Sequence, residues 1–275
     1  MPTLTSNRTS ALLGFLRPRD WWYYVALPLI GGGPGARSPG DAAPGLLAAG
    51  ACMAFAFGWN SWNDEGVDTF RPWSPRQLAV VLLAATVVAL GAAWTAGPVP
   101  LLAAAVSLVA GWCYSGGPRL KGVPYVNTLA NAPIFVPLGL MGGPDGPLGP
   151  ARWMLVAAFG LLLLQNQLIH EIQHDLEDRA ARVGTTYQRL GANATGAVSA
   201  ALGLAAAVLL AGLPLPAFPP WLPAVCAAPQ AALSVLQLAT RRGVTPQDAG
   251  SLRSLQRWIG LAVGAAAWVL VTWSA

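Results

Sequence analysis

Charged residues are scarce in this chain. Only 10% of its 275 residues are Asp, Glu, Lys or Arg and 55% are hydrophobic, whereas ordinary soluble domains carry about 25% charged residues. The deficit excludes a typical soluble globule, and the apolar content excludes an intrinsically disordered chain. The 31 glycines and 24 prolines stay below the level of low-complexity sequence, and membrane helices tolerate both residues.

Cysteine is also scarce, and no CxxC pair occurs. Cys52, Cys113 and Cys226 each lie in an apolar segment. We therefore expect buried small hydrophobes and no disulfide framework or thiolate metal site. The first twenty residues lack the continuous apolar core of a secretion signal, so no cleavable leader is expected.

The charge-free intervals are long enough to cross a bilayer. A membrane helix needs roughly 17 to 25 mainly apolar residues. The intervals 77–118 and 190–240 are each long enough for two spans and are broken by proline-containing segments. The sequence therefore predicts nine spans. They are 21–33, 43–60, 77–96, 99–115, 125–142, 153–172, 193–213, 221–240 and 256–274.

The basic residues predict the orientation of these spans. With the N-terminus inside, 14 of the 16 basic residues fall on the cytoplasmic side and only Arg37 and Arg152 fall outside. This is the asymmetry of the positive-inside rule. The basic residues of the cytoplasmic loops, which face anionic lipid, then account for the net charge of +5. This charge gives no support for a nucleic-acid partner. We expect an integral protein of a bacterial inner membrane.

The expected fold is all-α, a polytopic bundle of nine transmembrane helices around a central cavity. The loops 61–76, 116–124 and 173–192 would form a cytoplasmic cap over that cavity. No soluble appendage is expected, so residues 1–275 are predicted to form a single membrane domain.

Most of the acidic residues fall in two short stretches at predicted cytoplasmic span ends. The first places Asn60, Asp64 and Asp68 at positions i, i+4 and i+8 of one helix face, and the second places Glu171, Asp175 and Asp178 at i, i+4 and i+7. Two such faces pointing at each other would form an oxygen-rich site for Mg²⁺ that bridges to a substrate phosphate. The alternative is a pair of solvated helix ends whose acids interact with nearby arginines.

Basic and hydroxyl groups lie on the same predicted side. The stretch 114–121 ends a span and offers two hydroxyls, a Gly-Gly-Pro turn and two cations that could bind diphosphate oxygens. The alternative is ordinary positive-inside flanking. The candidate diphosphate-binding residues are Arg17, Asn60, Arg71, Tyr114, Ser115, Arg119 and Lys121.

Together these stretches resemble the UbiA superfamily of intramembrane prenyltransferases. Asn60, Asp64, Asp68 and Arg71-Pro72 are similar to its first Asp-rich motif. Residues 114–121 are similar to its YS…P…LK loop, and 171–179 with Thr185 and Gly191 are similar to its second motif. The three motifs follow the family's order. There are departures, since Ser61 stands where the first motif usually has an Asp and His174 stands where relatives often place an acid.

The resemblance implies a Mg²⁺-dependent transfer of an isoprenyl group from an isoprenyl diphosphate to an aromatic or other lipophilic acceptor. Asp64, Asp68, Lys121 and Asp178 would be catalytic, and the metal would be held by Asn60, Asp64, Asp68, Glu171, Asp175 and Asp178. A quinone precursor, a tetrapyrrole or a sugar phosphate all stay open as acceptors. A relative of the same fold that cyclises the prenyl diphosphate without an acceptor is an alternative.

A competing motif overlaps the second acidic stretch. His170-Glu171-Ile172-Gln173-His174 fits the H-E-x-x-H signature of zinc peptidases. This alternative leaves the first acidic stretch and the 114–121 loop without a role. A transporter is disfavoured because the predicted spans hold almost no ionisable residues away from their ends.

Overall fold

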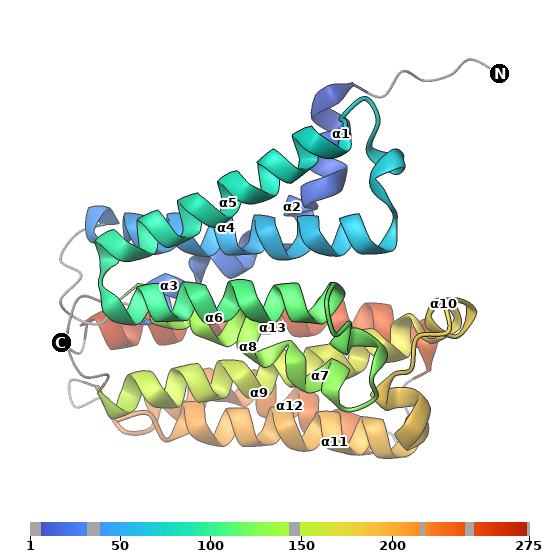
Figure 1. The fold of residues 1–275 in the computed structure, drawn as a ribbon. Coiled ribbons are helices and arrows are strands. Elements are labelled where there is room, and N and C mark those ends of the chain that lie inside the picture. The colour runs from blue at the N-terminus through green and yellow to red at the C-terminus, as the bar shows by residue number, and fades with distance from the viewer. Residues whose placement is uncertain (1–6, 32–38, 143–148, 215–217, 240–244, 274–275) are drawn as a thin grey trace.

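The structure is a computed structural model that describes residues 7–31, 39–142, 149–214, 218–239 and 245–273 (Figure 1). Every regular element in these ranges is helical, so the predicted all-α class is confirmed. In chain order they are α1 Arg8–Leu16, α2 Pro18–Trp21, η1 Trp22–Ala26, α3 Leu27–Gly31, α4 Pro39–Asp64, η2 Val67–Phe70, α5 Pro75–Ala96, α6 Pro98–Ser115, η3 Leu120–Gly122, α7 Val126–Ala130, α8 Ala132–Phe135, η4 Val136–Leu140, α9 Pro150–Gln173, α10 Asp175–Ala180, α11 Thr186–Ala211, α12 Leu222–Ala239 and α13 Pro246–Trp273.

Six of the described helices are long and apolar enough to cross a membrane alone, namely α4, α5, α6, α9, α11 and α12. The other three predicted spans take different forms. The described part of the predicted span 21–33, which reaches Gly31, consists of the short helices η1 and α3. The predicted span 125–142 is divided into α7, α8 and η4, and a proline lies at the start of both α8 and η4. The span 256–274 is the second half of α13.

The boundaries of α5 and α6 follow from local chemistry. Ser74 and Gln77 form a reciprocal capping box at the start of α5, which satisfies backbone N–H groups there. Gly97 ends α5 with a φ of 120°, and Pro98 starts α6 at once. The expected spans 77–96 and 99–115 agree with these helices to within two residues.

The two largest of four apolar clusters hold most of the bundle together. One lies among α4, α6, α8 and η4, and the other among α9, α11, α12 and α13. Small residues allow the close approach of the helices in the first core, where Ala48, Ala49 and Ala104 are fully buried. Gly142 packs so tightly that an added Cβ would lie 1.6 Å from the Pro28 carbonyl oxygen.

The outer faces are apolar as well. On α5 the side chains of Val80, Leu83, Val87 and Trp94 are 61 to 73% exposed. Such a continuous row of exposed apolar side chains would promote aggregation in water, but it is the normal surface of a helix in lipid. The protein is therefore an integral membrane protein.

Of the basic residues used to predict the orientation in the membrane, Arg37, Arg241 and Arg242 lie outside the described residues.

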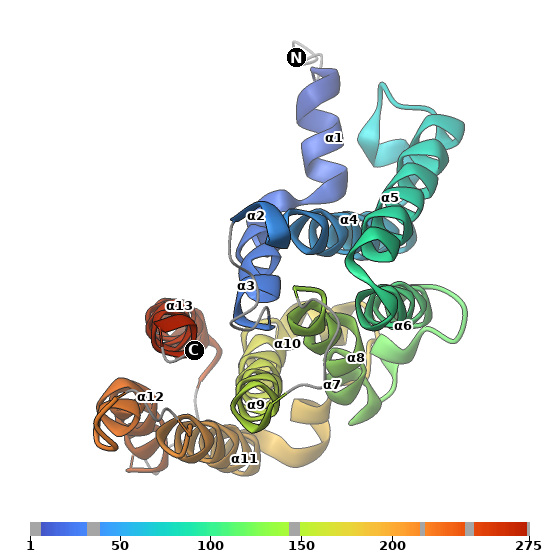
Figure 2. The same ribbon diagram turned by 90° about the vertical axis from the view of Figure 1, so that its left-hand side faces the viewer.

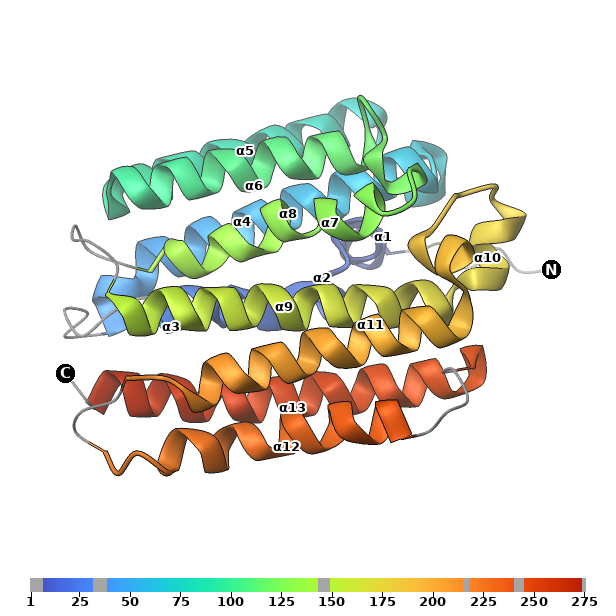
Figure 3. The same cartoon turned by 90° about the horizontal axis from the view of Figure 1, so that it is seen from below.

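The helices run roughly side by side, so the segments that follow α4, α6 and α9 meet at one end of the bundle (Figures 1 and 3). Figure 2 looks along the helices and shows the elements α2 to α9 grouped together, with α11, α12 and α13 beyond α9. The polar residues singled out in the sequence lie at the end marked by α10.

Candidate active site

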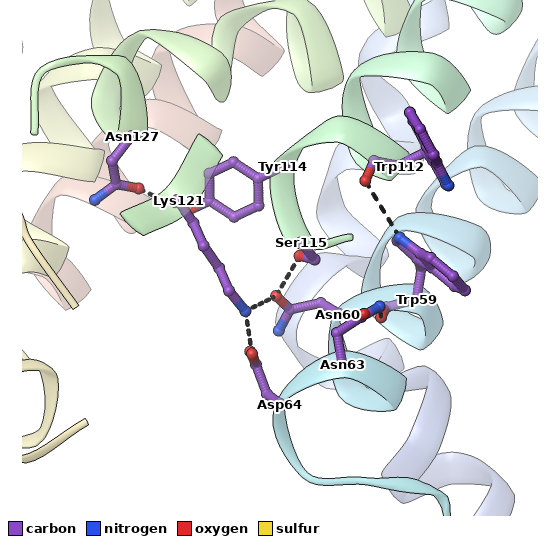
Figure 4. A network of polar contacts seen from close by, with 9 residues as sticks. All are labelled: Trp59, Asn60, Asn63, Asp64, Trp112, Tyr114, Ser115, Lys121 and Asn127. Carbon is purple, nitrogen blue, oxygen red and sulfur yellow. Dashed lines mark hydrogen bonds and ion pairs between the residues drawn. The ribbon is translucent and has the colours of Figure 1, made fainter. Parts of the chain in front are cut away.

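The end of α4 carries the centre of the first polar cluster. Asn60 accepts hydrogen bonds on Oδ1 from Ser115 Oγ at 2.6 Å and from Lys121 Nζ at 3.4 Å. Lys121 also forms an ion pair with Asp64 (Figure 4). The Lys121 side chain is only 10% exposed, against 36% for Asp64. The predicted association of Asn60, Asp64, Ser115 and Lys121 is therefore present.

Lys121 is the only lysine of the chain, and the loop after α6 holds it in place. Arg119 adopts a left-handed conformation with φ of 52°, and its N–H donates to the Gly116 carbonyl at 2.6 Å. Gly116 has no room for a side chain, since a Cβ there would lie 2.6 Å from the Trp59 ring. Arg119 itself is exposed and does not join the cluster.

Burial lowers the pKa of Lys121, and the hydrogen bond and charge of Asp64 oppose this effect. The charge of Asp178 also acts on the ammonium group. Lys121 therefore pairs with one acid of the first motif, and the charge of one acid of the second motif also acts on it.

A second polar cluster surrounds Glu171 near the end of α9. Its Oε1 accepts from Asn127 Nδ2 at 3.1 Å and from Thr128 Oγ1 at 2.6 Å, and its Oε2 accepts from the Tyr187 backbone N–H at 3.0 Å. Glu171 is 2% exposed. Its carboxylate therefore joins α7 and the start of α11 to α9.

The end of α6 connects the two clusters. Ser115 donates to Asn60 in the first, and Tyr114 Oη donates to Asn127 Oδ1 at 2.9 Å in the second (Figure 4). Two adjacent residues thus contact both clusters. The sequence singled out both hydroxyls.

The first predicted acidic helix face does not exist as such. The helix α4 ends at Asp64, and Gly66 turns the chain with a φ of 74°, so Asp68 lies in η2 instead of one turn further along α4. Asp68 is 87% exposed and pairs with Arg71 at 3.3 Å. The structure does not bring Asp68 or Arg71 to the Lys121 cluster.

The second face is interrupted at His174, which leaves helical geometry between α9 and α10. Asp175 accepts from Arg179 Nε on both oxygens at 2.9 Å. Burial raises the pKa of Asp178, with the nearby His174 charge opposing it. The first predicted face fails because a regular helical period was extended past the end of α4. The charges of the second stretch still act on one another across His174, since Asp178 acts on Glu171 and Asp175 acts on Asp178.

Arg17 lies at the junction of α1 and α2 with a φ of 50°. It pairs with Asp20 at 2.8 Å, and its guanidinium is 6.0 Å from the Phe57 ring centroid. Among the described residues no contact joins Arg17 to the Lys121 cluster; its side-chain contacts are with Asp20 and with Phe57 of α4.

The sequence profile of the UbiA prenyltransferase family matches residues 21–261. The chain belongs to this family. UbiA members are prenyltransferases, so the protein is an intramembrane prenyltransferase. No curated protein matches the chain at a significant level.

Solved structures share the fold of this UbiA prenyltransferase. A UbiA homologue from Archaeoglobus fulgidus with bound Cd²⁺ is 24% identical over 92% of this chain and 98% of its own, with a TM-score of 0.67. The same homologue bound to GPP and Mg²⁺ matches at 21% identity over 94% and 100%, with a TM-score of 0.68. A digeranylgeranylglyceryl phosphate synthase matches at 13% identity over 96% and 99%, with a TM-score of 0.73.

The H-E-x-x-H alternative is wrong for this UbiA prenyltransferase. Its would-be general base, Glu171, is saturated by the three donors described above, and His174 Nδ1 lies 2.6 Å from Glu177. In the described ranges no group of three or more His, Cys, Asp or Glu side chains is close enough to hold a metal ion by itself.

Three polar residues of this site were not singled out from the sequence: Asn127, Thr128 and Thr186. Thr186 Oγ1 lies 2.6 Å from Thr128 Oγ1 and accepts from the Tyr125 backbone N–H at 3.0 Å. The sequence feature that could have indicated Asn127 and Thr128 is the occurrence of Asn127, Thr128 and Asn131 within the otherwise apolar interval 122–144.

Proposed function

We propose that this UbiA prenyltransferase transfers an isoprenyl group from an isoprenyl diphosphate to a lipophilic or aromatic acceptor, with Mg²⁺ as cofactor. The observation that carries the proposal is the position of Lys121, paired with Asp64 of the first motif and within reach of the charge of Asp178 in the second. A fold relative with bound GPP and Mg²⁺ supports the substrate and metal class.

The donor chemistry at this end of the bundle fits Mg²⁺, which prefers carboxylate and amide oxygens and usually keeps waters and substrate phosphates as further ligands. This explains why no cage of three protein ligands is needed. We assign Asp64 to one side of the metal site and Asp178 to the other, with Asn60 bordering Asp64. Glu171 has both oxygens occupied by protein donors, and both oxygens of Asp175 accept from Arg179, so we assign these two acids to positioning. Asp68 pairs with Arg71 in the exposed loop and is not assigned to the metal.

When bound, Mg²⁺ would act as a Lewis acid that neutralises diphosphate charge. Lys121 and Arg119 would bind the non-bridging oxygens, and charge-assisted hydrogen bonds of this kind strengthen as the leaving group gains charge. Arg71 lies in the adjacent loop, and the Tyr114 and Ser115 hydroxyls hold the Asn127 and Asn60 amides that border this region.

In the proposed reaction the C–O bond of the prenyl diphosphate breaks and the diphosphate leaves with the electron pair. The allylic carbon forms a bond to the acceptor, which then loses a proton. Aromatic rings below the site would shield the cationic carbon from water. Tyr24 and Phe57 each pack against Phe135, with ring centroids 4.5 and 6.4 Å apart.

The remaining assignments concern the whole chain. We propose that residues 1–275 act as one membrane domain in a bacterial inner membrane, with the N-terminus and the end marked by α10 in the cytoplasm. The asymmetry of the basic residues supports this orientation.

The test is a turnover assay on the purified protein with Mg²⁺, labelled prenyl diphosphates and a panel of acceptors. Asp64→Asn should lower product formation at least about a hundredfold, because it removes both a metal ligand and the partner of Lys121. The matched control is Glu65→Gln, which neutralises the neighbouring exposed acid and should retain activity.

An active Asp64→Asn protein, or wild-type turnover that is unchanged by Mg²⁺ removal, would contradict the proposed site. Reactions without an acceptor separate transfer from cyclisation. A cyclic hydrocarbon or alcohol formed in that arm would identify a terpene cyclase and overturn the transferase proposal.

A further inference from the structure

Two indole rings pack directly on the backbone of the loop 116–122, which follows α6 and carries Lys121. The Trp59 ring lies where a side chain at Gly116 would be, since an added Cβ there would lie 2.6 Å from its Nε1 atom. The Trp112 ring occupies the same place at Gly117, where an added Cβ would lie 2.7 Å from Cη2. Each ring is therefore in contact with the loop backbone at one glycine.

The Trp59 ring is held by groups outside this loop. Its Nε1–H donates to the Trp112 backbone carbonyl at 3.3 Å, in the last turn of α6 (Figure 4). It stacks on the rings of Phe55 and Trp62, with centroids 6.4 and 6.3 Å away. The apolar cluster around these rings includes the fully buried Phe15 of α1. An indole with its N–H bonded and its faces packed is a rigid support for the loop.

Backbone hydrogen bonds connect this support to Lys121. The Arg119 N–H donates to the Gly116 carbonyl at 2.6 Å, and the Gly122 N–H donates to the Arg119 carbonyl at 3.1 Å. Two successive turns therefore leave little freedom between Gly116 and Lys121.

Adjacent residues of α4 contact both ends of this segment. Trp59 packs at Gly116, and Asn60 accepts from Lys121 Nζ at 3.4 Å (Figure 4). A lysine side chain has large rotamer freedom, and a ligand that must order it loses affinity. A loop fixed at both ends removes part of that cost. The precision matters, because a misplacement of about 1 Å can cost about a hundredfold in rate.

We propose that Trp59 and Trp112 are positioning residues whose rings fix the loop 116–122, so that Lys121 is preorganised for the diphosphate of the substrate. Both rings act through Lys121 and take no part in the chemistry. The proposal rests on the transferase function above and adds two residues that support its diphosphate site. The alternative is that the rings only pack, in which case their loss lowers stability without a selective effect on Lys121.

The experiment measures binding of a non-reactive prenyl thiodiphosphate in the presence of Mg²⁺, together with the melting temperature in the same detergent. Trp59→Leu should weaken binding about tenfold, because the loop loses its support at Gly116. The matched control is Trp62→Leu, which removes the next indole of the same stack. Trp62 is not among the nearest neighbours of either loop glycine, so binding should stay within about twofold of the wild type.

Gly116→Ala tests the same contact from the side of the loop. Its methyl group would displace the Trp59 ring or the loop, so binding should weaken about tenfold. The shorter side chain of Trp59→Leu makes room for this methyl, so adding Gly116→Ala to that variant should weaken binding by at most about a further twofold. Gly122→Ala is the control in the same loop. An added Cβ there meets nothing within 4 Å, so this variant should bind as the wild type does.

A combination with Lys121→Met separates positioning from packing. Lys121→Met alone should weaken binding about tenfold or more, because it removes a charge-assisted hydrogen bond to the diphosphate. If the ring acts through Lys121, adding Trp59→Leu should weaken binding of this variant by at most about twofold. Should Trp59→Leu fail to fold, Trp112→Leu provides the second variant and should show the same pattern, since the Trp112 ring is 45% exposed and contributes less to the core.

Two results would overturn the positioning proposal and leave the diphosphate site intact. One is binding by Trp59→Leu that is no weaker than binding by Trp62→Leu. The other is a full additional loss when Trp59→Leu is combined with Lys121→Met. Wild-type affinity in Lys121→Met would instead contradict the diphosphate site itself, and the positioning proposal would fall with it.

Discussion

Glu171 and Asp178 have similar side chains and contrasting surroundings. Glu171 accepts three hydrogen bonds from α7 and α11, whereas Asp178 has no hydrogen-bond or ion-pair partner for its carboxylate within the described ranges. At the scale of single residues, one acid therefore stabilises the fold and the other is available to a ligand.

This contrast predicts opposite effects of two conservative substitutions. Glu171→Gln places an amide N–H₂ against existing donors, so it should lower the free energy of unfolding by about 1–3 kcal/mol. Burial raises the pKa of Asp178, so its ionised form is less favourable in the folded chain than in the unfolded chain once the pH exceeds the ordinary aspartate value. Asp178→Asn should therefore leave the melting temperature unchanged or higher at pH 7.

Thermal unfolding and Mg²⁺ titration of both variants separate the two roles. Asp178→Asn should weaken Mg²⁺-dependent binding of the prenyl diphosphate, and Glu171→Gln should do so only to the extent that it unfolds the protein. Full stability in Glu171→Gln combined with lost metal affinity would make Glu171 a ligand after all.

At the scale of helices, the contact between α11 and α12 depends on Gly203. A Cβ at this position would lie 2.2 Å from Ser234 Oγ and 2.5 Å from Gln165 Nε2. These groups belong to a buried network in which Gln230 Nε2 donates to Gln165 Oε1 at 3.0 Å and to Ser234 Oγ at 3.2 Å. The network joins α9 to α12 within the membrane-spanning part of the bundle.

Gly203→Ala should therefore destabilise the protein by about 1–3 kcal/mol, the usual cost of overpacking. The control is Gly196→Ala in the same helix, where an added Cβ meets nothing within 4 Å. There the gain in helix propensity should stabilise by about 0.5–1 kcal/mol. Thermal unfolding of both variants would be measured in the same detergent. Equal melting temperatures would show that α11 and α12 can move apart to accept the added Cβ, and would contradict the prediction for Gly203.

The ends of α5 and α6 could be predicted because Gly97 and Pro98 act locally in the sequence. The predicted span 153–172 likewise ends within one residue of α9, whereas the acidic face drawn through Asp68 was wrong because the chain turns at Gly66, just past the end of α4. The pairing of Asn127 with Glu171, 44 residues apart, depends on helix packing and has no local sequence signal. The motifs thus predicted that Asn60, Asp64, Ser115 and Lys121 gather, but not that Asp68, Arg71 and Arg119 lie outside their cluster.

At the scale of the whole molecule, the orientation in the membrane can be tested directly. Arg182, after α10, and Trp221, before α12, are both exposed and belong to opposite ends of the bundle. Single cysteines placed there, with Cys52, Cys113 and Cys226 replaced, should differ in labelling by an impermeant maleimide in intact cells. Trp221→Cys should react at once and Arg182→Cys only after the cells are opened. The reverse pattern would invert the proposed topology.

The single lysine has a practical consequence. Reagents that carbamylate or acylate primary amines have only two targets in this chain, the N-terminal amine and Lys121. Lys121 lies in the loop after α6 against Asn60 and Asp64. If the proposed diphosphate site is right, the fraction of molecules modified at this one side chain should equal the fraction whose site is unoccupied. Protection of this residue would report occupancy without a radiolabel, an acceptor or turnover.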